Sequence, residues 1–308
     1  MLTTRRHIHK IAITAALYMV PTASFAYPDG EILFHNETSD TTRIDNLLSE
    51  GTTAVGNKNG NEQIFFFANN FVDAPYAAGT LEHSPEVLVV NIDEFDCTTF
   101  VETALALAYT IGEGRNSWRD FVYNLQRLRY KNGIVDGFSS RLNYFSDFVI
   151  DNTHRGNIKE ITSQLPGSEY TVKTIDYMSR NRDSYPALKD SVQYARIRET
   201  ESGYRSHRFP YIKSSRVASK ALWKELSDGD VVCITTKTPG LDVQHMGIIK
   251  KIDGVPYLLH ASSAAGKVTV DKFPLHEYLR RNRQASGIRV IRICWTASRR
   301  SRSWRSWT

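Results

Sequence analysis

The sequence predicts an α+β protein in which an antiparallel sheet packs against one buried helix. Two observations point to this fold class. Apolar residues recur at helical spacing after Cys97, which indicates a buried helix in the first half of the chain. From residue 217 onward, short segments rich in β-branched residues are separated by turn residues, which indicates strands. Because a helix-rich region precedes a strand-rich region, we expect an α+β topology.

The helix predicted to begin at Cys97 is the element around which we interpret the chain. Asp96 is a typical N-cap residue, and apolar residues form one face over residues 100–111. Gly112 and Gly114 then end the pattern. Cys97 lies in the first turn, where unpaired N–H groups and the helix dipole favour a thiolate over a thiol. Free cysteines are more often buried as small hydrophobic residues, so a catalytic role requires partners elsewhere in the chain.

Both ends of the chain differ in composition from the body. Residues 1–26 are typical of a secretory signal peptide, with basic residues before an apolar run and Ala26 before an expected cleavage site. The apolar run is too short to span a bilayer, and no later stretch is apolar enough to do so. We therefore expect no membrane span and an exported protein, most simply in a bacterial periplasm. Residues 295–308 form a basic, low-complexity tail that we expect to be disordered.

The net charge of +6 is concentrated at these two ends. The signal segment and the tail both carry basic residues, and neither carries an acidic residue. The body between them is therefore close to neutral and offers no broad basic surface for nucleic acid. We expect a monomer with no nucleic-acid partner.

The first two thirds of the chain are expected to be irregular and then helical. Residues 27–90 are interpreted as an irregular lead-in packed on the following domain, and residues 115–216 as a helical insert. Ser117, with Asp120 three residues later, forms a capping-box pattern at a helix start. The elements expected before residue 217 are a short helix at 42–48, a strand at 87–91, helices beginning at Cys97, Ser117 and Pro186, and a loop at 198–216.

The last third is predicted to contain the sheet. Asp253-Gly254 separates two apolar runs and is a typical hairpin turn. The expected elements are helices at 217–226 and 274–283 and strands at 231–235, 244–251, 255–261, 267–270 and 288–294. Cys233 and Cys294 lie on two of these strands. They could form a disulfide only if their Cα atoms lie within about 7 Å, and we favour two buried thiols over a bridge.

Two histidines are predicted to meet at one end of the hairpin. His245 opens its first strand, His260 ends its second, and the turn lies near the middle of the segment between them. Single histidines outside such a pattern are commonly surface or core residues. With Cys97 on the preceding helix, however, the two histidines fit a nucleophile, a base that takes its proton, and a group that orients the base.

Four short segments resemble the NlpC-type cell-wall cysteine peptidases of the papain-like superfamily. In the order found in that family, they are Asp96-Cys97, Asp230-Val231-Val232, His245-Met246-Gly247-Ile248-Ile249 and His260-Ala261-Ser262-Ser263. The longer runs at 95–102 and 241–245 resemble more closely the N-acetylmuramoyl-L-alanine amidase branch, long catalogued as a domain of unknown function. The resemblance covers roughly residues 85–294.

This resemblance implies a papain-like, NlpC-like α+β fold with the nucleophilic cysteine on the buried helix. Cys97 would be the nucleophile, His245 the base and His260 the orienting group. The catalytic domain would span residues 91–294. The insert at 115–216 is longer than a minimal domain of this kind needs, and it would wall a substrate groove.

The activity implied by the resemblance is hydrolysis of the bond between N-acetylmuramic acid and L-alanine in peptidoglycan fragments. An endopeptidase that cuts within the stem peptide would use the same residues. A zinc amidase with Cys97, His245 and His260 as ligands is a different class, but the sequence lacks His-x-x-x-His and Cys-x-x-Cys patterns. A non-catalytic muropeptide-binding module is the remaining alternative. We therefore expect no metal and no cofactor.

Candidate substrate contacts come from the resembling segments and from the insert. The first group is Asp96, Asp242, Ser262 and Ser263, and the second is Arg141, Tyr144 and Asn152. For each residue of the second group, we favour a packing or surface role over a role in substrate binding.

Overall fold

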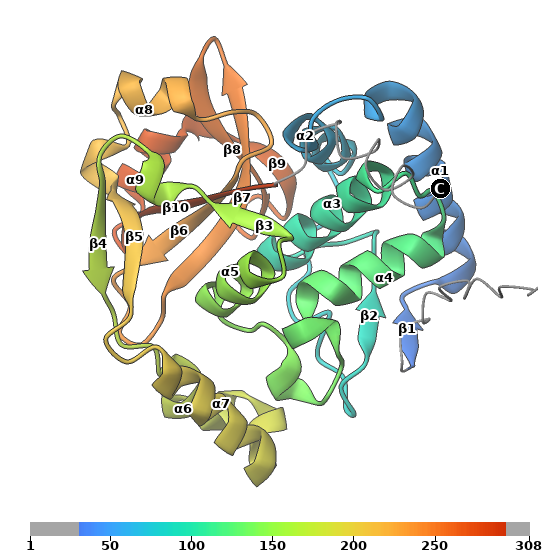
Figure 1. The fold of residues 1–308 in the computed structure, drawn as a ribbon, viewed down its shortest axis with the longest axis horizontal. Coiled ribbons are helices and arrows are strands. Elements are labelled where there is room, and N and C mark those ends of the chain that lie inside the picture. The colour runs from blue at the N-terminus through green and yellow to red at the C-terminus, as the bar shows by residue number, and fades with distance from the viewer. Residues whose placement is uncertain (1–30, 294–308) are drawn as a thin grey trace, which may run out of the picture.

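A sheet of eight strands and a cluster of helices lie side by side in the computed structural model, which describes residues 31–293 (Figure 1). The hydrogen-bonded strand order is β4-β5-β10-β6-β7-β8-β9, and β3 pairs with the C-terminal part of β10. Every pair in this sheet is antiparallel. The sequence prediction of an α+β protein with an antiparallel sheet is thus confirmed.

The strands of the sheet are β3 (Ile158–Glu160), β4 (Ser168–Val172), β5 (Arg208–Lys213), β6 (Val231–Thr236), β7 (Val243–Ile252), β8 (Val255–Ser262), β9 (Lys267–Pro274) and β10 (Ala285–Ile293). A separate parallel pair is formed by β1 (Ile32–Phe34) and β2 (Leu88–Val90).

The helices are α1 (Glu37–Val55), α2 (Gly60–Asn70), α3 (Cys97–Gly112), α4 (Trp118–Arg129), α5 (Phe145–His154), α6 (Tyr177–Arg180), α7 (Ser191–Gly203), α8 (Lys220–Glu225) and α9 (Leu275–Arg281). Short 3-10 turns lie at Lys131–Gly133, Phe138–Ser140, Thr162–Gln164, Arg182–Ser184, Pro186–Lys189 and Ser214–Arg216.

Helix α3 begins at Cys97 and ends at Gly112, as the sequence predicts. The Asp96 carboxylate accepts hydrogen bonds from the backbone N–H groups of Thr98 and Thr99, at 2.9 and 2.8 Å. The Asp96 N–H in turn donates to the Thr99 hydroxyl, so the capping box closes. The helix is buried on all sides after its first turn, because it packs against α2, α4 and β7. This packing places the start of α3 beside the sheet.

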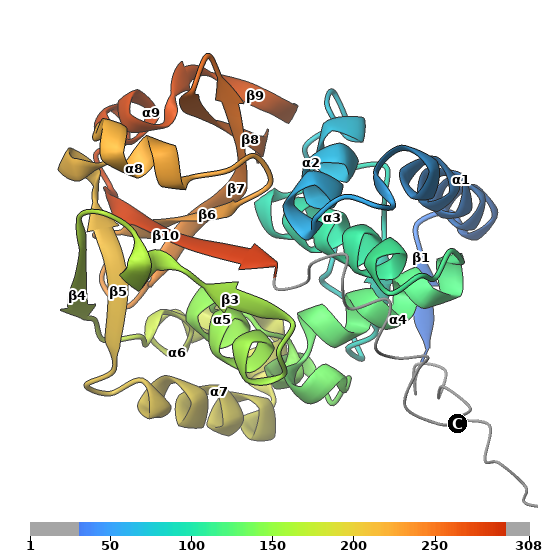
Figure 2. The same ribbon diagram turned by 45° about the horizontal axis from the view of Figure 1, so that its top comes forward.

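The sheet is buried on both faces, because successive residues of its central strands face different cores. Cys233 and Ile248 belong to the core shared with α3. Val232 and Ile249 belong to a second core, to which α8 and α9 contribute leucines. Figure 2 shows α8 and α9 on the side of the sheet away from α3.

The lead-in at 27–90 contains more regular structure than the sequence indicated. Besides β1 and β2, it forms the two helices α1 and α2. The predicted helix at 42–48 is the middle of the longer α1. Asn59 and Glu62 close a capping box at the start of α2, and this local pattern was the available signal.

The insert at 115–216 contributes strands as well as helices. It supplies β3, β4 and β5 to the sheet, and the prediction of a loop at 198–216 is wrong. Pro210 interrupts the pattern of β5, in which Phe209 and Ile212 are buried. Pairing with β4 and β10, which are distant in sequence, therefore stabilises this strand more than local alternation does.

Several predictions fall on the ends of the chain. The signal segment, the tail and Cys294 lie outside the described residues. The possible bridge between Cys294 and Cys233 is therefore outside them too, although Cys233 itself is described and lies buried on β6. Within residues 31–293, no helix is long and apolar enough to cross a membrane.

Candidate active site

Cys97 lines a cavity of about 110 Å³ where the start of α3 meets the start of β7. The residue is half-buried, and its Sγ lies 4.0 Å from the Thr98 hydroxyl. His245 and Met246 of β7 line the same cavity. The fold thus brings together Cys97 and His245, which are distant in sequence.

His245, His260 and Asp271 form a row across the neighbouring strands β7, β8 and β9. His245 Nε2 lies 2.6 Å from His260 Nδ1, so the two rings share a hydrogen bond. His260 Nε2 lies 3.6 Å from Asp271 Oδ2 and has no hydrogen-bond partner among the described residues. Only 2% of the His260 surface is exposed, so its ring is held within this row.

Gly247 allows β7 and β8 to lie close together at His260. A Cβ at this position would lie 2.9 Å from the His260 Cβ and 2.8 Å from the carbonyl oxygen of Leu259. Real Cβ atoms essentially never approach other atoms closer than 3.0 Å, so any side chain here would displace β8. The glycine therefore permits the close approach of the strand that carries His260 to the strand that carries His245.

The contacts of the row favour one tautomer for each ring. The Asp271 carboxylate can only accept, which favours a hydrogen on His260 Nε2. His260 Nδ1 then accepts from the Nε2–H of His245, and His245 Nδ1 carries no hydrogen. This is the form in which His245 can take a proton.

The electrostatics of Asp271 agree with this arrangement. Burial acts to raise the pKa of Asp271, but its interactions with His260 and with the backbone N–H of Phe273 hold the pKa below its ordinary value. Asp271 is therefore ionised at neutral pH and able to accept from His260.

Its position at a helix start does not activate the Cys97 thiol. Burial and the neighbouring Asp96 carboxylate raise the pKa of Cys97 to about 11. Hydrogen bonding with the backbone of Met246 and with the Thr98 hydroxyl opposes this rise only in part. The sequence expectation of a thiolate is therefore wrong for the resting protein, because desolvation outweighs the helix start.

His245 is also held in its neutral form. Burial and the neighbouring His260 lower the pKa of His245 to about 3, although Asp271 opposes the shift. At neutral pH, Cys97 and His245 are therefore a neutral thiol and a neutral imidazole. Such a pair can react only if the imidazole takes the proton as the sulfur attacks.

The insert supplies a wall of the cavity. Leu142, Asn143, Phe145 and Phe148 line it from the segment at the start of α5. The expectation that residues within 115–216 border the groove thus agrees with the lining of the cavity.

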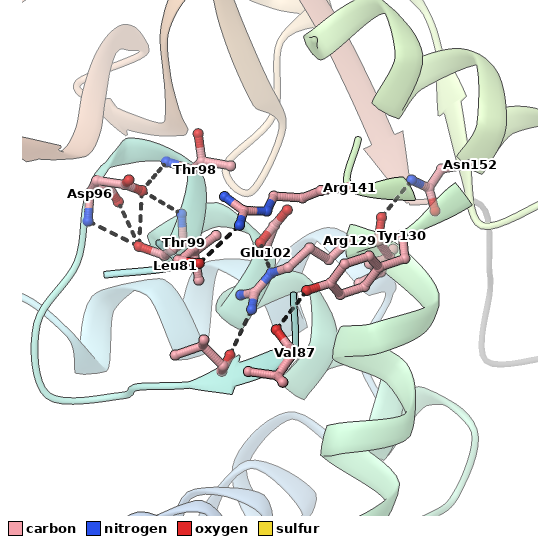
Figure 3. A network of polar contacts seen from close by, with 12 residues as sticks. Leu81, Val87, Asp96, Thr98, Thr99, Glu102, Arg129, Tyr130, Arg141 and Asn152 are labelled. Carbon is pink, nitrogen blue, oxygen red and sulfur yellow. Dashed lines mark hydrogen bonds and ion pairs between the residues drawn. The ribbon is translucent and has the colours of Figure 1, made fainter. Parts of the chain in front are cut away.

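The guanidinium of Arg141, a candidate substrate contact, bonds to other residues of the protein, and Figure 3 shows its hydrogen bond to Leu81. Its guanidinium forms ion pairs of 2.8 Å with Glu82 and Glu86 and donates to the carbonyl of Leu81 at 2.9 Å. Arg141 does not line the cavity that contains Cys97. Its contacts join the insert to the loop before β2.

Tyr144 and Asn152 also have packing roles. The Tyr144 hydroxyl donates to Glu201 at 2.9 Å, and the Asn152 amide donates to the carbonyls of Leu128 and Phe148 at 3.0 Å. Both side chains are buried, and neither lines the cavity. The structure therefore does not bring the three candidates from the insert to Cys97.

Among the four candidates from the resembling segments, Asp242 is the one that lines the cavity. Its carboxylate accepts two backbone hydrogen bonds, at 2.7 and 2.8 Å. Asp96 is occupied as the cap of α3. The Ser262 hydroxyl accepts from a backbone N–H in the turn after β8, where Ser263 is exposed. Substrate contact stays a prediction for these residues.

Asp271 was missed by the sequence analysis, because β9 was expected to end at Val270 and instead runs to Pro274. Thr269 pairs with His260, and Asp271 lies two residues later on the same face of the strand. The pairing of β8 and β9 shifts register just after Val270, so local alternation in the sequence did not indicate the place of Asp271.

A zinc site is not favoured by the geometry. Within residues 31–293, no three His, Cys, Asp or Glu side chains are grouped so as to hold a metal ion. His245 Nε2 and His260 Nδ1 also share one hydrogen, so these two nitrogens are not both free to bind a metal. The alternative of Cys97, His245 and His260 as zinc ligands therefore has no ligand set in this part of the chain.

A larger, open depression of about 760 Å³ lies elsewhere on the described surface, beside α5 and α7. Lys131 lies in it and contacts both Asp147, at 3.4 Å, and Thr200, at 2.6 Å. It is not lined by a cysteine. The candidate site is therefore identified by its chemistry and not by its size.

A thiol, two imidazoles and a carboxylate, gathered where a helix start meets an antiparallel sheet, define the class as an α+β protein with a candidate cysteine–histidine site. Residues 66–288 match the AmiA-like family, described as N-acetylmuramoyl-L-alanine amidase-like. The protein belongs to this family. The matched region includes Cys97, His245, His260 and Asp271.

Solved structures show the same similarity. An N-acetylmuramoyl-L-alanine amidase from Bacteroides uniformis is 36% identical, with a TM-score of 0.73, over 77% of this chain and 99% of that one. A Bacteroides fragilis protein named as a proposed xylanase is 40% identical, with a TM-score of 0.69, over 74% of this chain and 99% of that one. A Legionella pneumophila protein, at 24% identity and a TM-score of 0.63, supports the fold alone. A comparison with curated proteins found no match.

Proposed function

We propose that this protein is a cysteine amidase that hydrolyses the bond between N-acetylmuramic acid and L-alanine in peptidoglycan fragments. Family membership and the amidase among the similar structures support the reaction. One observation carries the catalytic assignment. His245 shares a cavity with Cys97 and is hydrogen-bonded to His260 at 2.6 Å.

The same arrangement supports membership of the NlpC-type branch of papain-like cysteine peptidases. The cysteine begins a buried helix, the base lies on an adjacent strand, and the orienting group lies on the next strand. This order of elements is what the resemblance implied.

The first half of the reaction forms a thioester. His245 Nδ1, the ring nitrogen not bonded to His260, takes the proton of Cys97 as the sulfur attacks the lactyl carbonyl carbon. A carbon–sulfur bond forms, and the carbonyl electron pair moves to oxygen. When the intermediate collapses, the carbon–nitrogen bond breaks and the L-alanine nitrogen takes the proton from His245.

The second half returns the enzyme to its resting state. Water attacks the thioester while His245 takes one of its protons, and the carbon–sulfur bond breaks. The sulfur regains a proton from His245, and muramic acid leaves with a free carboxyl group, which then loses its proton to solvent. The backbone N–H of Cys97 is one candidate donor to the oxyanion in both halves, by position.

Asp271 and His260 act on this reaction through His245. The hydrogen bond between His245 and His260, together with the nearby Asp271 carboxylate, keeps His245 Nδ1 free of hydrogen before the attack and stabilises the imidazolium after it. We assign positioning roles to both residues.

Two alternatives use the same cavity. A stem-peptide endopeptidase would cut at a different bond, and a binding module would hold muropeptides without cutting them.

Xylanase chemistry, by contrast, needs two carboxyl groups that flank the sugar bond. The carboxylates that line the cavity, Glu102 and Asp242, are bonded to Arg129 and to backbone N–H groups.

We also propose that the protein acts after export, in a bacterial periplasm. The signal-like segment at 1–26 and the extracytoplasmic position of peptidoglycan support this location.

The test is to incubate the protein, starting at Tyr27, with one defined muropeptide and to identify the products by mass spectrometry. Free peptide beginning with L-alanine, together with the unsubstituted muramic sugar, is the expected result. A sugar that still carries L-alanine and D-glutamate would favour the endopeptidase. Binding without any product would favour the binding module. Thiol alkylation should abolish hydrolysis, and chelators should not affect it.

A further inference from the structure

Gln244 lines the cavity of Cys97, and the nitrogen of its side-chain amide has no partner. This Nε2 is buried, and it forms no hydrogen bond within the described residues. A buried amide nitrogen that has lost water and gained no acceptor is destabilising. Because most buried polar groups are paired, an unpaired one in the lining of the cavity that contains Cys97 calls for a specific role.

An irregularity in β7 frees Gln244 from regular pairing. His245 pairs with Ile234 of β6, but Val243 pairs with Thr235, so Gln244 is the extra residue between two registers. Bulges of this kind change the direction of a side chain and recur next to active sites. The backbone therefore supports an unusual direction for this one side chain.

Neighbouring contacts bring this part of β7 close to the sulfur. The backbone of Met246, two residues after Gln244, hydrogen-bonds with the Cys97 thiol. Asn143 is a second amide in the lining, but its nitrogen already donates to the carbonyls of Phe138 and Arg141 at 3.1 and 3.0 Å. Of these two amides, Gln244 is the one with a donor to spare.

We propose that the Gln244 amide donates a hydrogen bond to the oxyanion formed when Cys97 attacks the acyl carbon, beside the backbone N–H of Cys97. As the carbon–sulfur bond forms, the carbonyl electron pair moves to oxygen. The negatively charged oxygen then accepts a hydrogen bond from the Nε2–H of Gln244. When the carbon–nitrogen bond breaks, the pair returns to re-form the carbonyl, and the hydrogen bond weakens. This inference rests on the proposed cysteine mechanism.

The test compares Gln244→Met with the parent protein. Methionine has a similar length and no N–H donor. Loss of one preorganised oxyanion donor typically lowers kcat by about 10²–10³-fold, and we expect a fall of that order with KM little changed. Cys97 alkylation by iodoacetamide forms no oxyanion, so its rate should stay the same. The melting temperature should not fall, because the variant removes an unpaired buried amide.

Gln164→Ala is the matched control, since this glutamine is exposed on a distant 3-10 turn. It should leave kcat, KM and alkylation unchanged. A second variant, Gln244→Glu, keeps the shape but places negative charge beside the oxyanion. Its activity relative to the parent should recover as pH falls and the carboxyl protonates, which a packing role would not produce.

Two outcomes separate this inference from the proposed function. A parent protein that cleaves the muropeptide, with Gln244→Met within twofold of it, would overturn the role of Gln244 and leave the amidase proposal intact. If the muropeptide is not cleaved, p-nitrophenyl acetate provides a simpler acyl group. A Cys97-dependent ester cleavage lost in Gln244→Met would then support Gln244 and overturn only the substrate. Absence of Cys97-dependent cleavage of both compounds would overturn both.

Discussion

Cys97 and His245 both keep their neutral forms at neutral pH, and for the same physical reason. Burial disfavours the charged form of each group. It raises the pKa of the Cys97 thiol to about 11 and lowers the pKa of the His245 imidazole to about 3. The start of a helix is therefore insufficient to activate a cysteine when the site is dry. In the proposed mechanism, the row of His245, His260 and Asp271 instead prepares a base that acts at the moment of attack.

The pH dependence of Cys97 alkylation tests this resting state. The reactive form is the thiolate, so a pKa of about 11 predicts that the iodoacetamide rate rises about tenfold per pH unit from pH 7 to 10. Mass spectrometry of the peptide containing Cys97 measures the rate, and Cys97→Ala shows the background from other thiols. A rate that is already constant between pH 5 and 8 would indicate a preformed thiolate–imidazolium pair and contradict the prediction.

Substitutions along the row should form an ordered series in kcat. Cys97→Ala should abolish turnover, because no other group forms the acyl bond, and His245→Ala should be nearly as severe. His260→Ala should be milder, and Asp271→Asn mildest, since each acts through its neighbour. Asp253→Asn, in the exposed turn between β7 and β8, is the control and should match the parent. Full activity in the first three variants would exclude the mechanism.

At the scale of elements, one buried ion pair fixes α3 against α4. Arg129 Nε lies 2.6 Å from Glu102 Oε2, and both side chains are almost fully buried (Figure 3). Arg129 also donates to the carbonyl of Val89 on β2 at 2.6 Å. Since Glu102 lies in the lining of the cavity, this pair connects the stability of the helical layer to the shape of the site.

Removal of one partner of this pair should be strongly destabilising. Arg129→Ala leaves the Glu102 carboxylate buried and unpaired, so we expect the free energy of unfolding to fall by about 3–5 kcal/mol. Urea unfolding followed by circular dichroism measures the change. Arg119→Ala, an exposed position on the same helix, should cost about 0.5–1 kcal/mol at most. Equal losses in the free energy of unfolding would show that the buried ion pair contributes no more to stability than the exposed arginine does.

The elements that could be predicted are those encoded by local signals. The cap at Asp96 fixed the start of α3, and the Asp253-Gly254 turn fixed the β7–β8 hairpin with its two histidines. By contrast, β5 depends on partners far away in sequence, and its own pattern indicated a loop. Dependence on residues far away in sequence also limited what could be predicted of the candidate site. The packing role of Arg141 could not be specified from the sequence, because Glu82 and Glu86 reach it only through the fold.

For the whole molecule, the insert forms part of the lining of the cavity that contains Cys97. The cavity is small, about 110 Å³, and the insert and β7 both border it. A long glycan strand has to pass this rim with its neighbours attached, whereas a soluble fragment presents a single muramic–peptide end. If the protein is the amidase proposed above, a cavity of this size predicts a preference for fragments over intact wall.

This preference predicts a difference in rate between two substrates that share the same bond. At equal muramic acid content, release of peptide beginning with L-alanine should be faster from soluble muropeptides than from intact sacculi. Sacculi digested beforehand with a glycan-cleaving enzyme should approach the rate of the soluble fragments, because only the polymer has been removed. Mass spectrometry of the released peptides gives all three rates. Equal rates on intact and digested sacculi would show that the insert does not restrict access and that the enzyme acts on the wall itself.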